Sequence, residues 1–233
     1  MKNNNKYIIV AGNIASGKTT LTQKLADITG FSPIYEKVVG NPYLEDFYKD
    51  MKKYSFPLQI YFLRHRFVVH RQIIEEGKNI IQDRSVFEDE AIFAKNLHKT
   101  GIMDDRDFKN YKELFKIMSD FFMPPDLVVY LHADIATLME RIQARGRDYE
   151  KNIEKKYLEN INIFYEEWTS SFKLSPVKRV NSKLVNFHNP VGLNTLADEI
   201  LEQIGMKKNE KPASSSLLDG NFIKMDTVGV GVY

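Results

Sequence analysis

Residues 12–19 read Gly-Asn-Ile-Ala-Ser-Gly-Lys-Thr, and this stretch constrains the fold of the chain more than any other. It follows an apolar run at 7–11 and precedes a helix-like segment at 20–26, which is the strand, turn and helix order of a phosphate-binding loop. The glycines let the backbone approach a polyphosphate, and amides at the helix N-terminus point at its oxygens. Lys18 can reach the outer phosphates, and the Thr19 hydroxyl can ligate Mg²⁺. A nucleoside triphosphate is therefore expected at these residues: Gly12, Asn13, Ile14, Ala15, Ser16, Gly17, Lys18, Thr19 and Thr20.

The rest of the chain alternates between short apolar runs and longer helical patterns. Further strands are expected at 31–36, 79–83, 127–131 and 176–181. Helices are expected at 42–51, 56–76, 87–97, 104–122, 135–144, 153–171 and 190–204. This alternation predicts an α/β fold in which a five-stranded parallel sheet is flanked by helices on both faces, forming one domain over residues 1–204.

The balance of charges and the lack of cysteine narrow the class of protein. Lys and Arg total 33 against 31 Asp and Glu, and a net charge of +2 gives no field that would favour nucleic acid or an anionic membrane. Without Cys there are no disulfides and no thiolate metal sites, so a cytoplasmic protein is expected. Residues 205–233 carry no core periodicity and are expected to be a disordered tail, the alternative being a partner-binding tail.

Charged residues follow two of the predicted strands at their carboxyl ends, where α/β folds bind ligands. Glu36 ends the second strand, and Asp83 and Arg84 end the third. Beside a phosphate-binding loop, such a carboxylate suits phosphoryl transfer, in which Mg²⁺ bridges phosphates and the carboxylate orients or deprotonates the acceptor. The alternative is that Glu36 caps the next segment and that Asp83 and Arg84 form a local ion pair.

Three of the nine arginines lie within seven positions of one another. Arg141 and Arg145 are four apart and share one helix face, and Arg147 follows the flexible Gly146. Because Arg binds oxyanions in bidentate fashion, we expect a mobile lid over about residues 141–150 that covers the phosphates and excludes water. A solvated basic face is the alternative.

Polar residues also interrupt two apolar helical stretches. Gln59 and Arg66 are seven apart and share a face, and Asp89 lies in the next predicted helix. Together they can read the hydrogen-bonding edge of a nucleobase, although a core polar cluster satisfied internally is the alternative. The five His show no metal spacing, and His65 and His70 are expected at the surface.

Several motifs, taken in order from about Tyr7 to Trp168, resemble the deoxyribonucleoside kinase family, and the bacterial deoxyadenosine/deoxyguanosine kinases are the nearest branch. The resemblance implies a cytosolic, dimeric enzyme that moves the γ-phosphate of ATP to the 5′-hydroxyl of a deoxynucleoside with Mg²⁺. The motifs are residues 12–19, Glu36-Lys37-Val38, Phe47-Tyr48, Ser55-Phe56-Pro57-Leu58-Gln59, Asp83-Arg84-Ser85-Val86 and Arg145-Gly146-Arg147.

The same resemblance implies roles for the reacting groups. Glu36 contacts the 5′-hydroxyl and is a candidate base. Asp83 holds Mg²⁺ together with Thr19 and is the rival candidate, and Arg84 steadies the transferring phosphoryl group. The matched lid residues are Arg141, Arg145 and Arg147, and a loop near 182–184 would meet the adenine of ATP.

The acceptor residues follow from the resemblance in the same way. Tyr48 and Glu150 match positions that hold the sugar 3′-hydroxyl, and Phe93 matches one that stacks on the base. Positions around the base are matched by Gln59, Arg66 and Asp89. In having both Arg66 and Asp89, the chain resembles the purine and deoxycytidine kinases. Deoxyadenosine is therefore the favoured acceptor, and deoxyguanosine and deoxycytidine are the alternative acceptors.

Two other functions compete with this interpretation. A nucleoside monophosphate kinase, such as a thymidylate kinase-like enzyme, also has the loop, an Asp-Arg motif and an Arg lid, but Glu36 would repel its anionic acceptor. A nucleotide-dependent binding module is the alternative from another class. The guanine signature Asn-Lys-x-Asp is missing, because Asn181-Ser182-Lys183-Leu184 lacks the final Asp.

Overall fold

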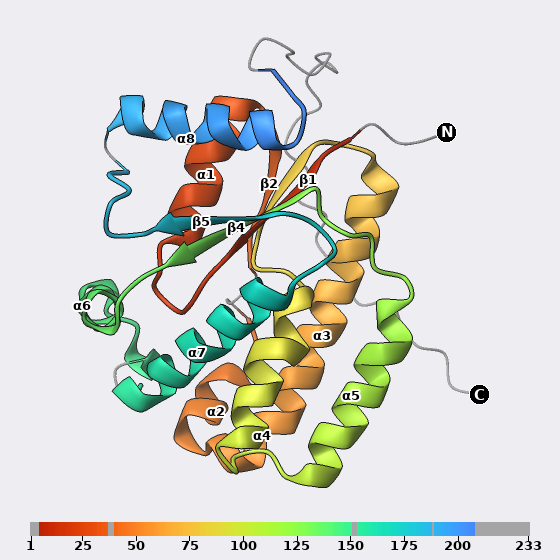
Figure 1. Cartoon of the computed structure of the whole chain (residues 1–233). Coiled ribbons are helices and arrows are strands. Elements are labelled where there is room, and N and C mark those ends of the chain that lie inside the picture. Colours follow the sequence, from red (N-terminus) through yellow and green to blue (C-terminus); the bar gives the residue numbers. More distant parts are fainter. Residues whose placement is uncertain (1–4, 37–39, 151–152, 188, 208–233) are drawn as a thin grey trace.

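A parallel sheet of five strands forms the centre of the computed structural model, which describes residues 5–36, 40–150, 153–187 and 189–207 (Figure 1). The strands run in the order β2-β3-β1-β4-β5, and every neighbouring pair is parallel. The predicted fold class is confirmed. The strands are β1 Tyr7–Ala11, β2 Ser32–Ile34, β3 Ile80–Asp83, β4 Leu127–His132 and β5 Val177–Asn181.

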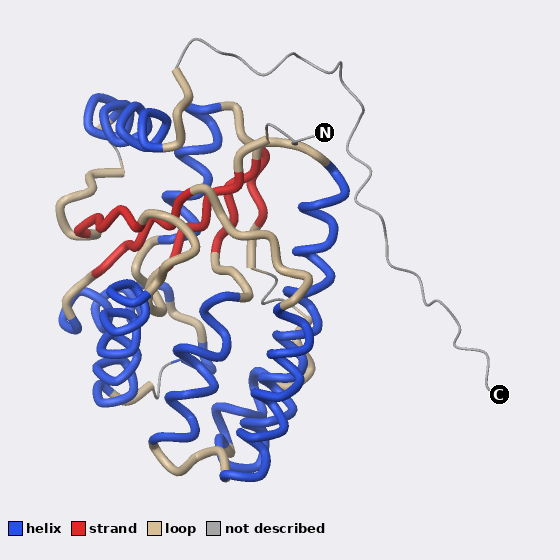
Figure 2. Tube along the Cα trace, turned by 45° about the vertical axis from the view of Figure 1, so that its right-hand side comes forward, coloured by secondary structure: helices blue, strands red, loops and turns tan. Residues whose placement is uncertain are grey.

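Helices cover both faces of this sheet, as Figures 1 and 2 show from two directions. On one face lie α1 Lys18–Thr29 and α8 Pro190–Gln203. The other face is covered by α3 Met51–Glu76, α5 Asp105–Ser119 and α7 Lys155–Ser171. The shorter helices are α2 Leu44–Lys49, a π-helix η1 Asp89–Ala94, α4 Lys95–Lys99, α6 Ile135–Arg145 and a 3₁₀ turn η2 Asp148–Glu150.

Side chains of β1 alternate between the two hydrophobic layers. Tyr7, Ile9 and Ala11 belong to the core on the α3 and α7 side. Ile8 and Val10 belong to the core on the α1 and α8 side. A strand whose successive side chains face opposite covered layers must be largely apolar throughout, which is why β1, residues 7–11, has no charged residue.

Helix α3 begins earlier than the sequence pattern predicted. Asp50 caps it by accepting a hydrogen bond from the Lys53 amide at 3.0 Å. Pro57 consequently lies inside the helix instead of in its first turn. Pro57 has no amide hydrogen to donate back along the helix, and the continuous buried face of α3, which includes Leu58 and Leu63, keeps the helix intact across this gap.

The predicted helix at 87–97 is divided in the structure. Its first part is the π-helix η1, and its second part is α4. A π-helix inserts an extra residue per turn and often marks a functional site, and the apolar pattern of a short segment does not distinguish it from an α-helix.

The chain ends of the predicted domain are described only in part. Helix α8 ends at Gln203, close to the predicted boundary at 204. Residues 208–233 of the predicted tail lie outside the described residues, so the disorder expected there stays a prediction. Within the described ranges, no helix is both long and apolar enough to cross a membrane.

Candidate active site

The glycine-rich loop joins β1 to α1 in a conformation that requires its glycines. Gly12 has a φ of 155°, and a Cβ there would lie 2.6 Å from the Leu131 carbonyl oxygen and 2.7 Å from Ser16 Oγ. Gly17 has a φ of 101°, and a Cβ there would press on the Phe187 ring at 3.1 Å. Any side chain at Gly12 would therefore clash with the Leu131 backbone. Because glycine has no side chain, the loop stays open for a ligand's phosphates.

Asn13 fixes this loop to helix α7. Its side-chain amide donates to the Leu158 carbonyl at 2.9 Å and to Asn162 Oδ1 at 2.7 Å, while its own Oδ1 accepts from the Ile14 amide at 2.7 Å. The Lys18 ammonium donates to the Asn13 carbonyl at 2.8 Å, so it lies across the loop. A phosphate entering the loop would meet Lys18 there.

Burial and charge set the titration of Lys18. Burial and the neighbouring Arg84 cation lower the pKa of Lys18 to about 8, while Asp83 and Glu36 act in the opposite direction. A lysine with this pKa still carries its charge at neutral pH, and a bound phosphate would favour the charged form further.

Asp83 ends β3 beside the loop, and its Oδ2 accepts a hydrogen bond from the Thr19 hydroxyl. Its other oxygen, Oδ1, is buried and has no hydrogen-bond partner among the described residues. Burial raises the pKa of Asp83, an effect that Lys18 partly offsets. A hydroxyl and a carboxylate with a free buried oxygen are the donor set that Mg²⁺ prefers, so these residues fit the predicted metal site.

Glu36 lies after β2 and is held by two arginines. Its Oε1 pairs with the Arg66 guanidinium, and its Oε2 lies 3.3 Å from Arg84 Nε. Arg66 also pairs with the fully buried Asp89 on η1. Burial would raise the pKa of Glu36, but the charges of Arg84, Arg66 and Lys18 outweigh it and lower that pKa to about 2. Glu36 is therefore ionised at neutral pH.

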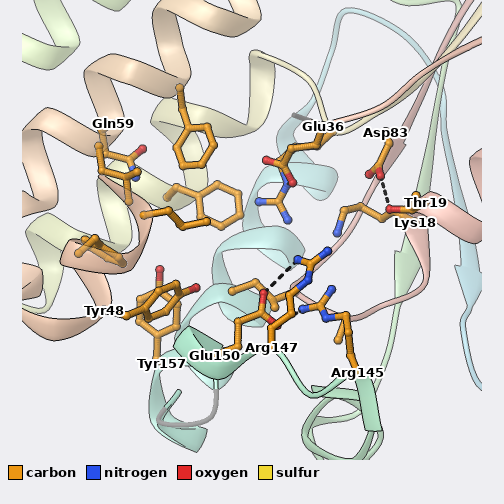
Figure 3. Close-up of a pocket in the computed structure, with 18 of the residues that line it drawn as sticks. Lys18, Thr19, Glu36, Tyr48, Gln59, Asp83, Arg145, Arg147, Glu150 and Tyr157 are labelled. Carbon is orange, nitrogen blue, oxygen red and sulfur yellow. Dashed lines mark hydrogen bonds and ion pairs between the residues drawn. The ribbon is translucent and has the colours of Figure 1, made fainter. Parts of the chain in front are cut away.

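A cavity of about 240 Å³ connects these groups. Figure 3 shows Gln59, Tyr48 and Tyr157 at one end of it and Lys18, Thr19 and Asp83 at the other, with Glu36 between the two groups. Asp89 does not line the cavity and lies behind Arg66. The predicted residues that line it are Ile14, Ala15, Lys18, Thr19, Glu36, Tyr48, Gln59, Arg66, Asp83, Arg84, Phe93, Arg145, Arg147 and Glu150.

The structure places the three clustered arginines in two different environments. Arg145 and Arg147 line the cavity, and both pair with the buried Glu150 (Figure 3). Arg147 Nη1 lies 3.3 Å from Glu150 Oε1. Arg141 instead donates to the Ser16 carbonyl at 2.9 Å and to Ser182. Arg141 therefore contacts the phosphate-binding loop itself, and the role of the cluster as a lid stays a prediction.

Sequence reasoning missed Phe62 and Tyr157, which both line the cavity. Phe62 was detectable, because it lies three residues after Gln59 and four before Arg66 and so shares their helix face. Tyr157 was not detectable, because it lies on α7 and reaches the cavity only through the packing of that helix. Burial raises the pKa of Tyr157 to about 12, which keeps its hydroxyl protonated.

The surface position expected for His70 is wrong. This side chain is 1% exposed, and its Nε2 accepts a hydrogen bond from the Met123 amide at 2.7 Å. Burial lowers the pKa of His70 to about 4, so the ring is neutral and packs within the core.

Comparisons with known proteins show the family to which this chain belongs. The deoxynucleoside kinase family profile matches residues 8–204. A deoxyadenosine/deoxycytidine kinase of Bacillus subtilis (strain 168) is 40% identical over 205 residues, which cover 86% of this chain and 94% of that protein. A deoxyguanosine kinase of the same organism is 34% identical over 164 residues, covering 69% of this chain and 76% of that protein.

Solved structures give the same assignment. A structure of deoxyadenosine kinase from M. mycoides with bound dATP matches with a TM-score of 0.74 at 30% identity, covering 84% of this chain and 98% of that one. The chain therefore belongs to the deoxynucleoside kinase family and is a deoxyribonucleoside kinase.

Proposed function

We propose that this kinase transfers the γ-phosphate of ATP to the 5′-hydroxyl of a deoxyribonucleoside, with deoxyadenosine as the favoured acceptor, for nucleotide salvage. The observation that carries the proposal is the position of Glu36, between the cavity's Gln59 end and the Lys18 end (Figure 3). A neutral hydroxyl placed at Glu36 would donate to its carboxylate, whereas an acceptor phosphate would be repelled.

The acceptor base would lie against Gln59 and Phe93. Gln59 is 4% exposed, and its Oε1 makes no hydrogen bond within the described part of the chain. An amide offers one donor and one acceptor, which suits adenine, and cytosine presents a similar pair. Arg66, which would suit guanine, is already paired with Glu36 and Asp89. This supports deoxyadenosine, leaves deoxycytidine open and disfavours deoxyguanosine.

The sugar would lie between Tyr48 and Glu150. Burial and the neighbouring Tyr157 and Glu150 raise the pKa of Tyr48 well above its usual value, so its hydroxyl stays a donor. Glu150 accepts from Arg147, and its carboxylate can take a 3′-hydroxyl as a further donor.

The triphosphate would occupy the loop of residues 12–19, with Lys18 on the outer phosphates and Arg84 between the loop and Glu36. Thr19 and Asp83 would hold Mg²⁺, which neutralises phosphate charge when bound. Arg145 and Arg147 would close over the phosphates as a lid, exchanging Glu150 for phosphate oxygens. Ser182 is fully buried, and Leu184 is 80% exposed, so Leu184 is the better contact for the donor adenine.

Glu36 and Asp83 are rival bases, and their environments differ. Glu36 faces the acceptor cavity with a pKa of about 2, so it is always ionised but accepts a proton weakly. Asp83 has a raised pKa but is bonded to Thr19. We assign Glu36 to orient the hydroxyl and take its proton as the γ-phosphorus bonds the hydroxyl oxygen and its bond to ADP breaks, because, of the two carboxylates, Glu36 lies between the two ends of the cavity.

A cytoplasmic homodimer is proposed as the working form. Helices α3 and α5 pack together and leave apolar side chains exposed, among them Ile74, Leu114 and Ile117. Such residues on two long adjacent helices suit a self-complementary interface. Sedimentation velocity that gives only a monomer at enzyme-assay concentrations would contradict this part.

A radiolabelled ATP assay with all four deoxynucleosides tests the main proposal. The highest kcat/KM is expected for deoxyadenosine, with deoxycytidine next. Equal inactivity with every deoxynucleoside would refute the function, and a preference for deoxyguanosine would refute the role given to Gln59. Deoxynucleoside monophosphates serve as the control acceptors and should stay unphosphorylated.

A further inference from the structure

Glu88 is a buried acidic residue that the proposed reaction does not use. It is fully buried, one residue before η1, and its carboxylate accepts hydrogen bonds from two directions. The Ser85 amide donates to Oε2 at 2.8 Å and the Ser85 hydroxyl at 3.3 Å. The Tyr165 hydroxyl on α7 donates to Oε1 at 2.6 Å. Each carboxylate oxygen thus accepts hydrogen bonds from a different segment of the chain.

The turn that Glu88 closes contains Arg84 in an unfavourable conformation. Arg84 has a φ of 60°, which residues with a side chain seldom adopt. Its backbone amide donates to the Val10 carbonyl at 3.1 Å, and the next amide, that of Ser85, donates to Glu88. Strained backbone of this kind persists only where the surroundings hold it in place.

The conformation of Arg84 determines where its guanidinium lies. Nε is 3.3 Å from Glu36 Oε2, and a terminal nitrogen donates to the Gly12 carbonyl at 3.5 Å. The same group lies 4.3 Å from the centre of the Phe93 ring. A relaxed backbone at Arg84 would move the guanidinium away from both the loop and Glu36.

We propose that Glu88 and Tyr165 are positioning residues that hold Arg84 in its left-handed conformation, so that helix α7 aligns the guanidinium with the phosphate-binding loop. Asn162 on the same face of α7 binds Asn13 of that loop at 2.7 Å. One rigid helix therefore holds both the loop and the arginine turn. The catalytic consequence rests on the proposed function, in which Arg84 steadies the transferring phosphoryl group.

Tyr165→Phe tests the proposal, because it removes one hydroxyl and leaves every charge in place. Tyr130→Phe is the matched control: Tyr130 stacks on Tyr165 at 5.4 Å, and its hydroxyl bonds Glu166, away from Arg84. Tyr165→Phe should lower kcat about tenfold with both KM values nearly unchanged, since the lost contact acts on the transition state. Tyr130→Phe should change kcat by less than about twofold.

A double-mutant cycle with Arg84→Met separates positioning from a general structural effect. If Tyr165 acts through Arg84, then Tyr165→Phe should change kcat by less than about twofold in the Arg84→Met background. The proposal is overturned if Tyr165→Phe lowers kcat equally in the parent and in the Arg84→Met background. It is also overturned if Tyr130→Phe lowers kcat as much as Tyr165→Phe does. Glu88→Gln is a second variant, because the amide keeps one acceptor oxygen, so either the Ser85 amide loses its acceptor or the Tyr165 hydroxyl must turn from donor to acceptor.

Hydrogen exchange of the Ser85 amide, measured by NMR without substrate, makes the test independent of the reaction. Tyr165→Phe should speed this exchange about tenfold relative to Tyr130→Phe. Unchanged exchange refutes the positioning role even in an active enzyme. Faster exchange in a protein that phosphorylates no deoxynucleoside would instead refute the proposed function and leave the positioning role standing.

Discussion

The proposed donor and acceptor halves of the cavity are built in different ways. The donor half comes from one continuous stretch, residues 12–19, together with Asp83 at the neighbouring strand end. The acceptor half takes single side chains from several separate elements, among them Tyr48 from α2, Gln59 from α3 and Tyr157 from α7. Local sequence therefore determines the proposed phosphate site, whereas the proposed nucleoside site exists only after the helices have packed.

The two halves also treat their carboxylates differently. In the donor half, burial raises the pKa of Asp83. At the start of the acceptor half, Arg84 and Arg66 outweigh burial and hold the pKa of Glu36 at about 2. When their environments shift the pKa values of two neighbouring carboxylates in opposite directions, the groups have separate tasks. Here Asp83 suits a metal ion and Glu36 suits a hydroxyl.

The sharpest way to separate the halves is Lys18→Ala. Phosphoryl transfer should fall by at least about 10³-fold, because Lys18 is the cation that the proposed function places on the outer phosphates. Deoxynucleoside binding, measured by calorimetry, should change by less than about twofold. Lys24→Ala on the exposed side of α1 is the control. Loss of deoxynucleoside binding as well would mean that the loop also builds the acceptor site.

Glu36→Gln probes the junction between the halves. The kcat with deoxyadenosine should fall about 10²- to 10³-fold, because the amide cannot accept the proton and no longer pairs as a charge with Arg84. Asp83→Asn should instead weaken the Mg²⁺ dependence of the rate. The exposed Glu45 on α2 gives the control Glu45→Gln.

A monophosphate acceptor makes this second test decisive. If the enzyme phosphorylated a deoxynucleoside monophosphate, Glu36→Gln would spare or improve the rate, because the repelling charge would be gone. Unchanged kcat with deoxyadenosine would remove Glu36 as the base and leave Asp83.

Tyr48→Phe tests the acceptor half alone. KM for deoxyadenosine should rise about tenfold with a smaller change in kcat, because one hydrogen bond to the 3′-hydroxyl is lost. With 2′,3′-dideoxyadenosine, which lacks that hydroxyl, the variant and the parent should have equal KM values. Tyr61→Phe on the neighbouring helix α3 is the control, and an equal effect on both acceptors would contradict the assignment.

The same contrast explains what the sequence could predict. The loop and the strand-end residues Glu36 and Asp83 follow from local patterns, and the structure places them around one cavity, with Asp83 beside the loop and Glu36 between the two ends. Tyr157 depends on the packing of α7, and no spacing relates it to Glu36. Glu88 reads as an ordinary acidic residue until Tyr165 and Ser85 are seen to enclose it. The roles of these residues in catalysis remain predictions.

The smallest expected effect concerns pH and the donor half. Lys18 has a pKa lowered to about 8, so it is charged below that pH and neutral above it. Raising the pH from about 7.5 to about 8.5 should therefore increase KM for ATP by about threefold, since only the charged form attracts the phosphates. KM for deoxyadenosine should stay constant over this range, because Glu36 is fully ionised throughout. Steady-state kinetics at saturating second substrate give both constants. A parallel rise in the two KM values would show that the halves are coupled through Lys18 and do not bind their substrates separately.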